Sequence, residues 1–403
     1  MKSEWKVYSV QELIDLDMLE EPMDGNHGGI HPKSSDYVSS GVPFIMANNL
    51  SNGKVDYDNC AFISEQQATT LRKGFAHPGD VLLTHKATIG RTAIVGDEYD
   101  TIILTPQVTY YRVKHGISNR YLKYYFDSSE FQQTLSNWAG SGSTRAYLGI
   151  TAQRKLPIVL PPMETQEKIA GLCGALDEKI YLNNAINNNL FEQMQALYKA
   201  WFVDFEPFGG VRPPNWNDTN IYAIANIIYG APFASKLFNT DGLGKPIIRI
   251  RDLKEQAFVT FTTEEHPKGH LIQPGDIVVG MDGEFRPYIW GNEPAWLNQR
   301  VCIFESNRPQ GKAFVLYTIK PLLNKIEQTQ VATTVIHIGK KDFDAFEIVL
   351  PDEATLDNFD SITAPMIEQI VNNRLQNKRL AVLRDTLLPK LMSGELDVSD
   401  IDL

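Results

Sequence analysis

The sequence predicts an α+β protein in which two tandem, similar α/β domains are separated by two long helices that form an antiparallel coiled coil, with approximate two-fold symmetry. The first observation behind this prediction is an internal repeat. When residues 158–201 are moved forward by 190 positions, Ile-Val-Leu-Pro at 158–161 falls on Ile-Val-Leu-Pro at 348–351. Further identities follow at the same offset: Glu178, Ile180, Asn183, Asn187, Leu190 and Leu197 fall on Glu368, Ile370, Asn373, Asn377, Leu380 and Leu387.

The blocks that precede the two repeated segments also resemble each other. Pro-Gly-Asp occurs at 78–80 and again at 274–276, each time before an apolar run. Gly-Val-Pro-Phe-Ile at 41–45 is similar to Gly-Lys-Pro-Ile-Ile at 244–248. Two long copies exclude a solenoid, which needs three or more short units to close a core. We therefore expect the order domain, helix, domain, helix.

The first domain is expected over residues 1–161 and the second over 207–350. In both, short runs of β-forming residues alternate with Gly, Pro, Asn and Asp, which is typical of strands and turns. Strands are expected in the first domain at 42–46, 80–84, 92–95, 107–113 and 156–160, with a helical patch at 119–137. In the second domain they are expected at 247–250, 276–279, 300–304 and 346–350.

The two long helices are expected at 162–206 and 351–396, followed by an acidic tail at 397–403. Thr165 can cap the first helix after Pro161 and Pro162 end the last strand. Apolar residues then recur in steps of three and four, as in a coiled coil: Ile169, Cys173, Leu176, Ile180, Leu190, Met194, Leu197 and Trp201. The second helix carries a similar seam: Phe359, Thr363, Met366, Ile370, Leu380, Leu387 and Leu391. Pro365 is expected to kink this helix or delay its start.

Two asparagines interrupt each apolar seam and predict the helix register. Asn183 and Asn187 take successive seam positions in the first helix, as Asn373 and Asn377 do in the second. A buried asparagine without a partner costs about 1–3 kcal/mol. Pairing them with each other fixes the register, so in an antiparallel pair Asn183 should meet Asn377 and Asn187 should meet Asn373. The same register pairs Ile169 with Leu391 and Trp201 with Phe359. Arg384, which stands where the first copy has Met194, is expected to weaken the end of the second seam.

Composition and cysteine usage favour a cytoplasmic protein. No run approaches the roughly 18–20 apolar residues that a spanning helix needs, and the charged N-terminal segment lacks a following apolar run. We therefore expect no membrane association. The three cysteines, Cys60, Cys173 and Cys302, are isolated and form no CxxC pair.

The net charge of −11 is unusual for a protein that binds nucleic acid, because neutralising phosphates draws on surplus Lys and Arg. Most of the excess negative charge lies in the two predicted helices and the tail, whereas the globular domains are nearly neutral. If DNA is the ligand, partner proteins should supply much of the contact with phosphate.

Motifs for catalysis or cofactor binding are absent from the sequence. The Pro-Pro strings at 161–162 and 213–214 lack the polar and aromatic residues of an adenine methyltransferase motif, and Gly-Lys at 244–245 is followed by Pro246. The histidine pairs at 27 and 31 and at 266 and 270 lie in Gly- and Pro-containing loops, where a spacing of four has no helical meaning. Asp177-Glu178-Lys179 is interpreted as a solvated helix face. We expect no catalytic residue, no metal and no cofactor bound by this chain.

After motifs for catalysis are excluded, polar loops that could recognise a ligand are the remaining candidate functional sites. Thr84–Arg91 follows the first Pro-Gly-Asp strand, and Gly280–Arg286 follows the second. Both are Gly-bearing turns that end in arginine, which suits contacts to guanine or phosphate, and Asp or Glu suits cytosine. A small, basic loop at 140–145 and matching strand ends near residues 48 and 249 add further candidates. The candidate DNA-binding residues are Asn48, Asn49, His85, Lys86, Thr88, Arg91, Ser143, Arg145, Arg249, Arg251, Asp282, Glu284, Arg286, Gln299 and Arg300.

Several strings resemble the specificity subunit of type I restriction-modification systems. The strongest are Leu-Pro-Pro-Met-Glu-Thr-Gln-Glu-Lys-Ile-Ala at 160–170, Leu-Asp-Glu-Lys-Ile at 176–180 and Ala-Trp-Phe-Val-Asp-Phe at 200–205. Two more are Leu-Leu-Pro-Lys-Leu-Met-Ser-Gly-Glu-Leu at 387–396 and Trp-Leu-Asn-Gln-Arg-Val at 296–301. The resemblance covers essentially the whole chain.

The resemblance implies that each globular domain is a target-recognition domain that reads one half of a bipartite site in double-stranded DNA, while the helices set the spacer. It also implies two modification (methyltransferase) subunits that bring S-adenosylmethionine, and restriction subunits that bring ATP and Mg²⁺ for translocation and cleavage. The second copy has no glutamine matching Gln166, so its contacts with a modification subunit are expected to differ.

Two alternatives stay open at this point. The chain could be the recognition subunit of a stand-alone adenine methyltransferase without a nuclease, which the sequence does not distinguish. A coiled-coil structural adaptor would explain the helices but not two duplicated domains with Arg- and Lys-bearing loops.

Overall fold

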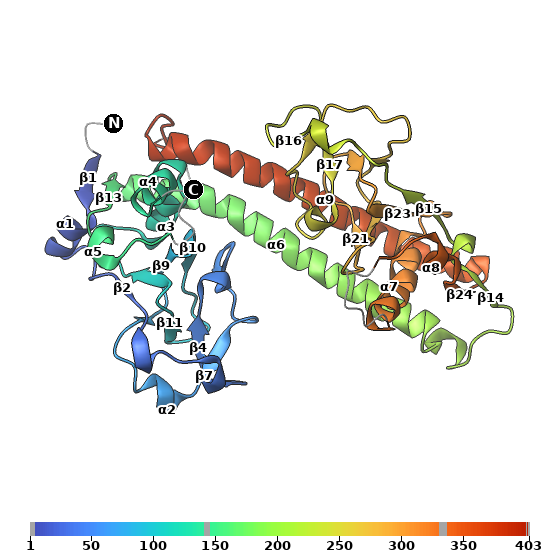
Figure 1. Cartoon of the computed structure of the whole chain (residues 1–403). Helices are drawn as coiled ribbons and strands as arrows, with labels where there is room; N and C mark the ends of the chain where they lie inside the picture. Colours follow the sequence, from blue (N-terminus) through green and yellow to red (C-terminus); the bar gives the residue numbers. More distant parts are fainter. Residues whose placement is uncertain (1–4, 141–145, 330–336, 400, 402–403) are drawn as a thin grey trace. The chain divides into compact units, whose positions relative to one another are not determined.

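The computed structural model describes residues 5–140, 146–329, 337–399 and 401, and these separate into two compact units (Figure 1). Unit 1 combines residues 1–178 with 381–403, and unit 2 is the continuous stretch 179–380. The long helices are α6 (Met163–Phe202) and α9 (Glu353–Met392). Each contributes to both units, and each agrees with its predicted range to within four residues at either end.

Unit 1 is built around three sheets. A two-stranded antiparallel sheet joins the beginning and end of the domain: β1 (Lys6–Ser9) and β13 (Pro157–Leu160). The six-stranded sheet has the order β2 (Met23–Asp24), β12 (Val108–Tyr111), β9 (Val81–Lys86), β10 (Thr88–Ile94), β6 (Gly53–Val55) and β5 (Leu50–Ser51). The five-stranded sheet has the order β3 (Tyr37–Val38), β7 (Ala61–Ile63), β4 (Val42–Ile45), β11 (Ile102–Leu104) and β8 (Phe75–Ala76). Its short helices are α1 (Val10–Asp15), α2 (Glu65–Ala68), α3 (Asn119–Asp127), α4 (Ser129–Trp138) and α5 (Ile150–Gln153).

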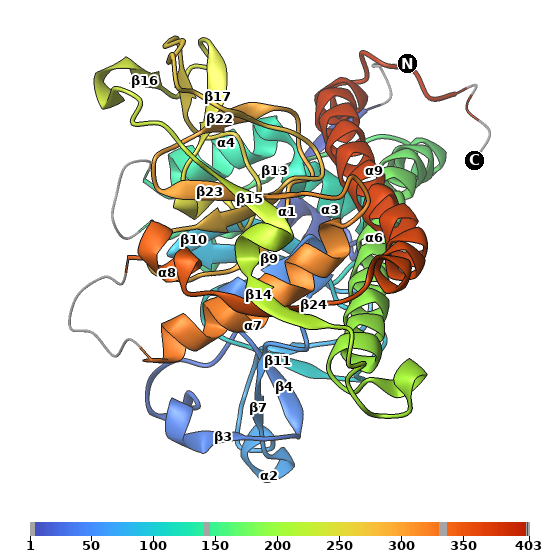
Figure 2. The same ribbon diagram turned by 90° about the vertical axis from the view of Figure 1, so that its right-hand side faces the viewer.

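Unit 2 also contains three sheets. The two-stranded sheet is β14 (Asn217–Asn220) with β24 (Glu347–Leu350). The four-stranded sheet has the order β15 (Ala225–Tyr229), β23 (Val301–Ser306), β20 (Ile277–Gly280) and β21 (Pro287–Ile289). The five-stranded sheet has the order β16 (Phe238–Asn239), β18 (Phe261–Thr262), β17 (Lys245–Ile248), β22 (Ala295–Leu297) and β19 (Leu271–Ile272). Helix α7 (Lys312–Thr329) lies against β21 and β23, and α8 (Lys340–Asp344) precedes the last strand, β24 (Figure 2).

The two units repeat one topology, strand by strand. In both five-stranded sheets the third and fourth strands are parallel, β4 with β11 and β17 with β22, whereas the other pairs are antiparallel. Two differences distinguish the copies. Unit 1 adds β5 and β6 at the edge of its larger sheet. It also divides the helical segment at Ser128, which ends α3 and caps α4, where unit 2 has the single helix α7.

Apolar seams of α6 and α9 complete the core of each unit. In unit 1, Ile169 and Cys173 share a buried cluster with Leu388 and Leu391. In unit 2, Met194 is buried together with residues of α9 and of the sheet. Burying apolar surface in this way supplies most of the stabilisation of such helices, since long helices gain little from propensity alone.

The predicted register of the helix pair is confirmed within unit 2. Asn183 donates to the side-chain oxygen of Asn377 at 2.8 Å, and Asn373 donates to that of Asn187 at 2.8 Å. The rings of Trp201 and Phe359 lie 5.9 Å apart. The helices are therefore antiparallel, and their polar gaps face each other.

One expectation about the start of the second long helix is wrong. Pro365 does not delay α9, which begins at Glu353. Because proline removes one backbone donor, the helix loses one hydrogen bond there, while neighbouring residues such as Phe359 and Ile367 stay buried in the core of unit 2. Arg384, the polar residue in the second seam, has a charged partner within unit 1, because its guanidinium binds the carboxylate of Asp177 at 2.5 Å.

Asp177 is not the solvated helix residue that its sequence context indicated. Its carboxylate also accepts a 2.7 Å hydrogen bond from the Tyr124 hydroxyl and lies 3.4 Å from the ammonium of Lys123. Burial by itself would raise the pKa of Asp177, yet Lys123, Arg384 and Tyr124 together hold that pKa below its usual value. No helix of the described residues is both long and apolar enough to cross a membrane.

Candidate nucleic-acid interface

The two predicted recognition loops occupy equivalent places in the sheets. Thr84–Arg91 forms the hairpin between β9 and β10, in which Lys86 pairs with Thr88 around Ala87, whose φ is 64°. Gly280–Arg286 connects β20 to β21, its equivalents in unit 2. A second segment closes each loop, since Tyr147 bridges to Lys86 and His337 bridges to Asp282. The side chains of Lys86, Thr88 and Tyr147 are exposed at this edge of unit 1.

His85 cannot contact DNA directly, because its side chain has no exposed surface. One ring nitrogen, Nδ1, lies 3.0 Å from the carbonyl oxygen of Leu148, whereas Nε2 has no hydrogen-bond partner and lies 3.9 Å from a carboxylate oxygen of Asp24. Burial lowers the pKa of His85, and Asp24 offsets this only in part. His85 therefore has a structural role in the interior of unit 1, beneath the hairpin. Its counterpart Met281 is also buried.

Asn49 is likewise a structural residue, whereas its neighbour Asn48 is exposed. The Asn49 side chain accepts from the amide of Met46 at 2.9 Å and donates to the carbonyl of Asn59 at 3.1 Å, and it is only 1% exposed. In unit 2, Asp252 accepts from the amide of Arg249 in the same way, at 3.0 Å. The two turns therefore present Asn48 and Arg251 at equivalent exposed positions.

Five of the predicted residues of unit 2 line one open hollow of about 460 Å³. The turn after β17, the β20–β21 loop and the β22–β23 turn place them there: Arg249, Arg251, Asp282, Gln299 and Arg300, together with Asn298. Arg251 and Arg300 are more than half exposed. Arginine and amide side chains on adjoining loops can donate to guanine O6 and N7 and bind adenine N6 and N7.

A charged cluster orients part of this hollow. Asp282 accepts from His337 Nδ1 at 2.6 Å and lies 3.6 Å from Nε of Arg300, and Nη1 of Arg300 is 3.1 Å from the His337 ring. Arg286 lies apart from the hollow, because its guanidinium binds Glu327 of α7. Glu284 is exposed on the same loop. The loop therefore carries two carboxylates. That of Asp282 is in contact with His337 and Arg300, and that of Glu284 is exposed.

In unit 1, fewer of the predicted DNA-binding residues lie close together. Arg91 is exposed on β10 and lies 3.5 Å from the carbonyl oxygen of Ala47, the residue before Asn48. Lys86 sits 6.0 Å from the ring centre of Tyr147. Ser143 and Arg145 lie outside the described residues.

Sequence reasoning missed three residues of this surface: Tyr147, Asn298 and His337. A signal for two of them was present, since the 190-residue offset of the helices extends back to Tyr147-Leu148-Gly149 and His337-Ile338-Gly339. No group of three or more His, Cys, Asp or Glu side chains in the described part of the chain is arranged to hold a metal ion.

The duplicated fold with polar loops at one edge of each copy can be compared with known proteins. The family model for the type I restriction modification DNA specificity domain matches residues 2–192 and 213–384. The chain belongs to this family. It is a DNA sequence-specificity subunit of the type I restriction-modification class, as the helix motifs and the Trp-Leu-Asn-Gln-Arg-Val string indicated.

Relatives of this specificity subunit match along nearly its full length. The MjaIX specificity subunit of Methanocaldococcus jannaschii is 26% identical over 93% of this chain and 91% of its own. The HindI specificity subunit of Haemophilus influenzae is 22% identical over 88% and 94%. The crystal structure of the type I S subunit from M. genitalium has the same fold, with a TM-score of 0.56, 14% identity and 96% coverage of both chains.

Proposed function

We propose that unit 1 and unit 2 of this specificity subunit each read one half of a bipartite site in double-stranded DNA, while α6 and α9 set the spacer between the halves. The observation that carries this proposal is the repeated topology with different polar side chains at equivalent positions. Asn48 stands where unit 2 has Arg251, and Lys86 stands where it has Asp282. Two copies of one fold that carry different polar side chains at their loops are suited to bind two half-sites of different sequence.

In unit 2, Arg251, Gln299 and Arg300 approach base edges in the major groove, and Asp282 keeps Arg300 in place through the charged cluster. In unit 1, Asn48, Lys86, Thr88 and Arg91 perform this task. Arginine or amide pairs to single bases carry sequence information, whereas lysine contacts to phosphate add affinity without it.

The chain acts without catalytic groups of its own in this proposal. Two modification subunits bind along the helices and bring S-adenosylmethionine, and restriction subunits add ATP- and Mg²⁺-dependent translocation and cleavage in the cytoplasm. The net charge of −11 supports the proposal that partner subunits contribute to DNA binding, since an acidic chain on its own binds phosphates weakly. The isolated chain should therefore bind DNA weakly at physiological salt.

The burial of Gln166 supports a structural role for this residue in our proposal. Gln166 is 1% exposed, donates to the carbonyl oxygens of Pro161 and Gly116, and accepts from the amide of Ser118. Its counterpart Leu356 is also buried. We therefore propose that Gln166 stabilises the start of α6 and that other residues of the helices bind the modification subunits.

Methylome sequencing of cells that carry this chain with its modification subunit tests the proposal. We expect one bipartite motif with a methylated adenine in each half. Replacing residues 1–161 by those of a relative should change one half only. A change in both halves, or the absence of a motif, would contradict independent reading by two units.

A further inference from the structure

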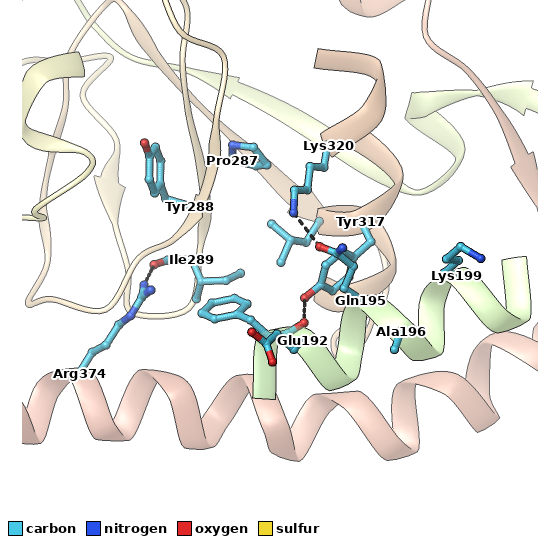
Figure 3. A pocket seen from close by; sticks show the side chains of 12 residues that line it. Glu192, Gln195, Ala196, Lys199, Pro287, Tyr288, Ile289, Tyr317, Lys320 and Arg374 are labelled. Carbon is cyan, nitrogen blue, oxygen red and sulfur yellow. Dashed lines mark hydrogen bonds between the residues drawn. The ribbon is translucent and has the colours of Figure 1, made fainter. Parts of the chain in front are cut away.

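A second hollow of unit 2 shares no lining residue with the hollow at the recognition loops. It has a volume of about 540 Å³ and is lined by α6, β21, α7 and α9 (Figure 3). Its lining is mostly apolar, with Phe191, Ile289, Leu316 and Tyr317 among the residues. The Tyr317 hydroxyl donates to the carbonyl oxygen of Phe191 at 2.6 Å, which ties α7 to α6 and holds the hollow open.

One exposed face of α6 forms the rim of this hollow. Glu192, Gln195, Ala196 and Lys199 are all exposed and follow the spacing of one helix face. The opposite face carries Met194, which is buried in the core of unit 2. A helix of another protein can therefore lie along this ridge and extend a side chain into the hollow beside the small residue Ala196.

The guanidinium of Arg374 lies in the wall of the hollow. Arg374 donates to the carbonyl oxygen of Ile289 at 2.5 Å and lies 5.5 Å from the ring centre of Phe191. Gly291 leaves room for it, because a Cβ there would meet its side chain at 2.3 Å. No carboxylate of the described residues forms an ion pair with Arg374, and burial alone lowers its pKa. Lys320 adds positive charge at the rim, whereas Lys199 forms an ion pair with Asp204, and Glu192 is the one carboxylate among the lining residues.

Unit 1 has a hollow at the equivalent place, but its chemistry differs. It is lined by β10, α3, α9 and α6, the counterparts of β21, α7, α6 and α9, with added residues from β5 and β6. Four charged residues neutralise one another there: Lys123 and Arg384 bind Asp177, and Lys123 also binds Asp127 at 2.9 Å. An apolar side chain would have to displace these ion pairs, so this hollow does not suit one.

We infer that the hollow of unit 2 binds an apolar or aromatic side chain, with a carboxylate close to it, on a helix of one modification subunit. The inference rests on the proposed function, in which modification subunits bind along α6 and α9. The carboxylate would pair with Arg374 and Lys320, and the apolar group would cover Phe191 and Tyr317. The two modification subunits therefore bind through different contacts, although the two units share one topology.

The experiment compares Ala196→Trp, which fills the hollow, with Ala196→Ser, which leaves it open. Full-length variants are mixed with the modification subunit, and stoichiometry is read by native mass spectrometry. Wild type and Ala196→Ser should bind two modification subunits. Ala196→Trp should bind one, with the second weakened by roughly 30-fold or more, as for an interface anchor. Lys320→Glu should weaken the same subunit more than Lys320→Gln. Thermal unfolding of each variant checks that the fold is kept.

Each outcome separates the inference from the proposed function. If wild type binds no modification subunit, the proposed function fails. If wild type binds two and both Ala196→Trp and Lys320→Glu also bind two with unchanged affinity, only the inference is overturned. If Ala196→Trp keeps both subunits but the complex loses affinity for DNA, the hollow faces DNA and the inference is wrong. If Ala196→Trp unfolds, p-benzoylphenylalanine at Lys199 on the rim replaces it: crosslinks to a modification-subunit segment with apolar and acidic residues support the inference, and their absence contradicts it.

Discussion

The side-chain amide of Asn373 donates a 2.8 Å hydrogen bond to the side-chain oxygen of Asn187 across the two long helices, and both residues are buried. Gln369 on the same helix donates to Asn373 at 2.7 Å. A polar pair inside an apolar seam stabilises less than leucines would, but it is satisfied in one register only. The pair therefore fixes how far α6 slides along α9.

The first prediction concerns this pair. Asn187→Leu should lower the free energy of unfolding by about 1–3 kcal/mol, because Asn373 is left buried without its partner. Asn187→Leu combined with Asn373→Leu should recover most of that loss. Urea unfolding followed by circular dichroism measures both. A double variant as unstable as the sum of the two single variants would show that the asparagines do not act as a pair.

The second prediction concerns Asp177. Asp177→Asn should destabilise the protein at pH 7 by about 1.5–3 kcal/mol, as expected for losing hydrogen bonds to a charged group. The pKa of Asp177 is lowered in the folded protein, so the stability that it contributes is complete above its unfolded pKa of about 3.9 and is lost as pH falls through the folded pKa. The difference in free energy of unfolding between wild type and variant should therefore decrease as the pH falls. Glu178→Gln, which changes the neighbouring exposed carboxylate, is the matched control.

The third prediction concerns His85. Because burial lowers its pKa from 6.5 in the folded protein, the unfolded chain takes up a proton at higher pH than the folded chain does. The free energy of unfolding should therefore fall as pH drops below about 6.5. His85→Gln removes this contribution, so its stability should depend less on pH between 7 and 5. His115→Gln, on an exposed loop, should behave like wild type. Parallel curves for wild type and His85→Gln would contradict the assignment.

The fourth prediction concerns DNA reading. Arg251→Ala should relax specificity in one half-site only, and Asn48→Ala in the other. Each lost base contact should cost about 1–3 kcal/mol of discrimination. Competition binding of the assembled complex to oligonucleotides substituted in one half at a time gives the measurement. His115→Gln should leave base preference unchanged, since its native side chain lies on an exposed loop outside both turns and the hairpin. Relaxation of both halves by Arg251→Ala would show that the units do not read independently.

The helices and their register could be predicted because long seams and paired asparagines depend on local spacing. The repeated strand order could not, since strands such as β3 and β16 have two residues each and different loop lengths hide the match. The contrast between Asn48 and Asn49 depends on which amide closes a turn, and adjacent identical residues give no sign of that. Asp177 was misjudged because its partners Lys123 and Tyr124 are distant in sequence.

Unit 1 is discontinuous in sequence, because the segment that follows Leu380 belongs to the same unit as the segment before Lys179, and Leu391 and Val398 are buried in its core. Unit 2 is continuous between these two segments. During translation the ribosome therefore supplies every residue of unit 2 before it delivers Leu391 and Val398 to the core of unit 1. A frameshift near codon 380 would spare the second unit and damage the first.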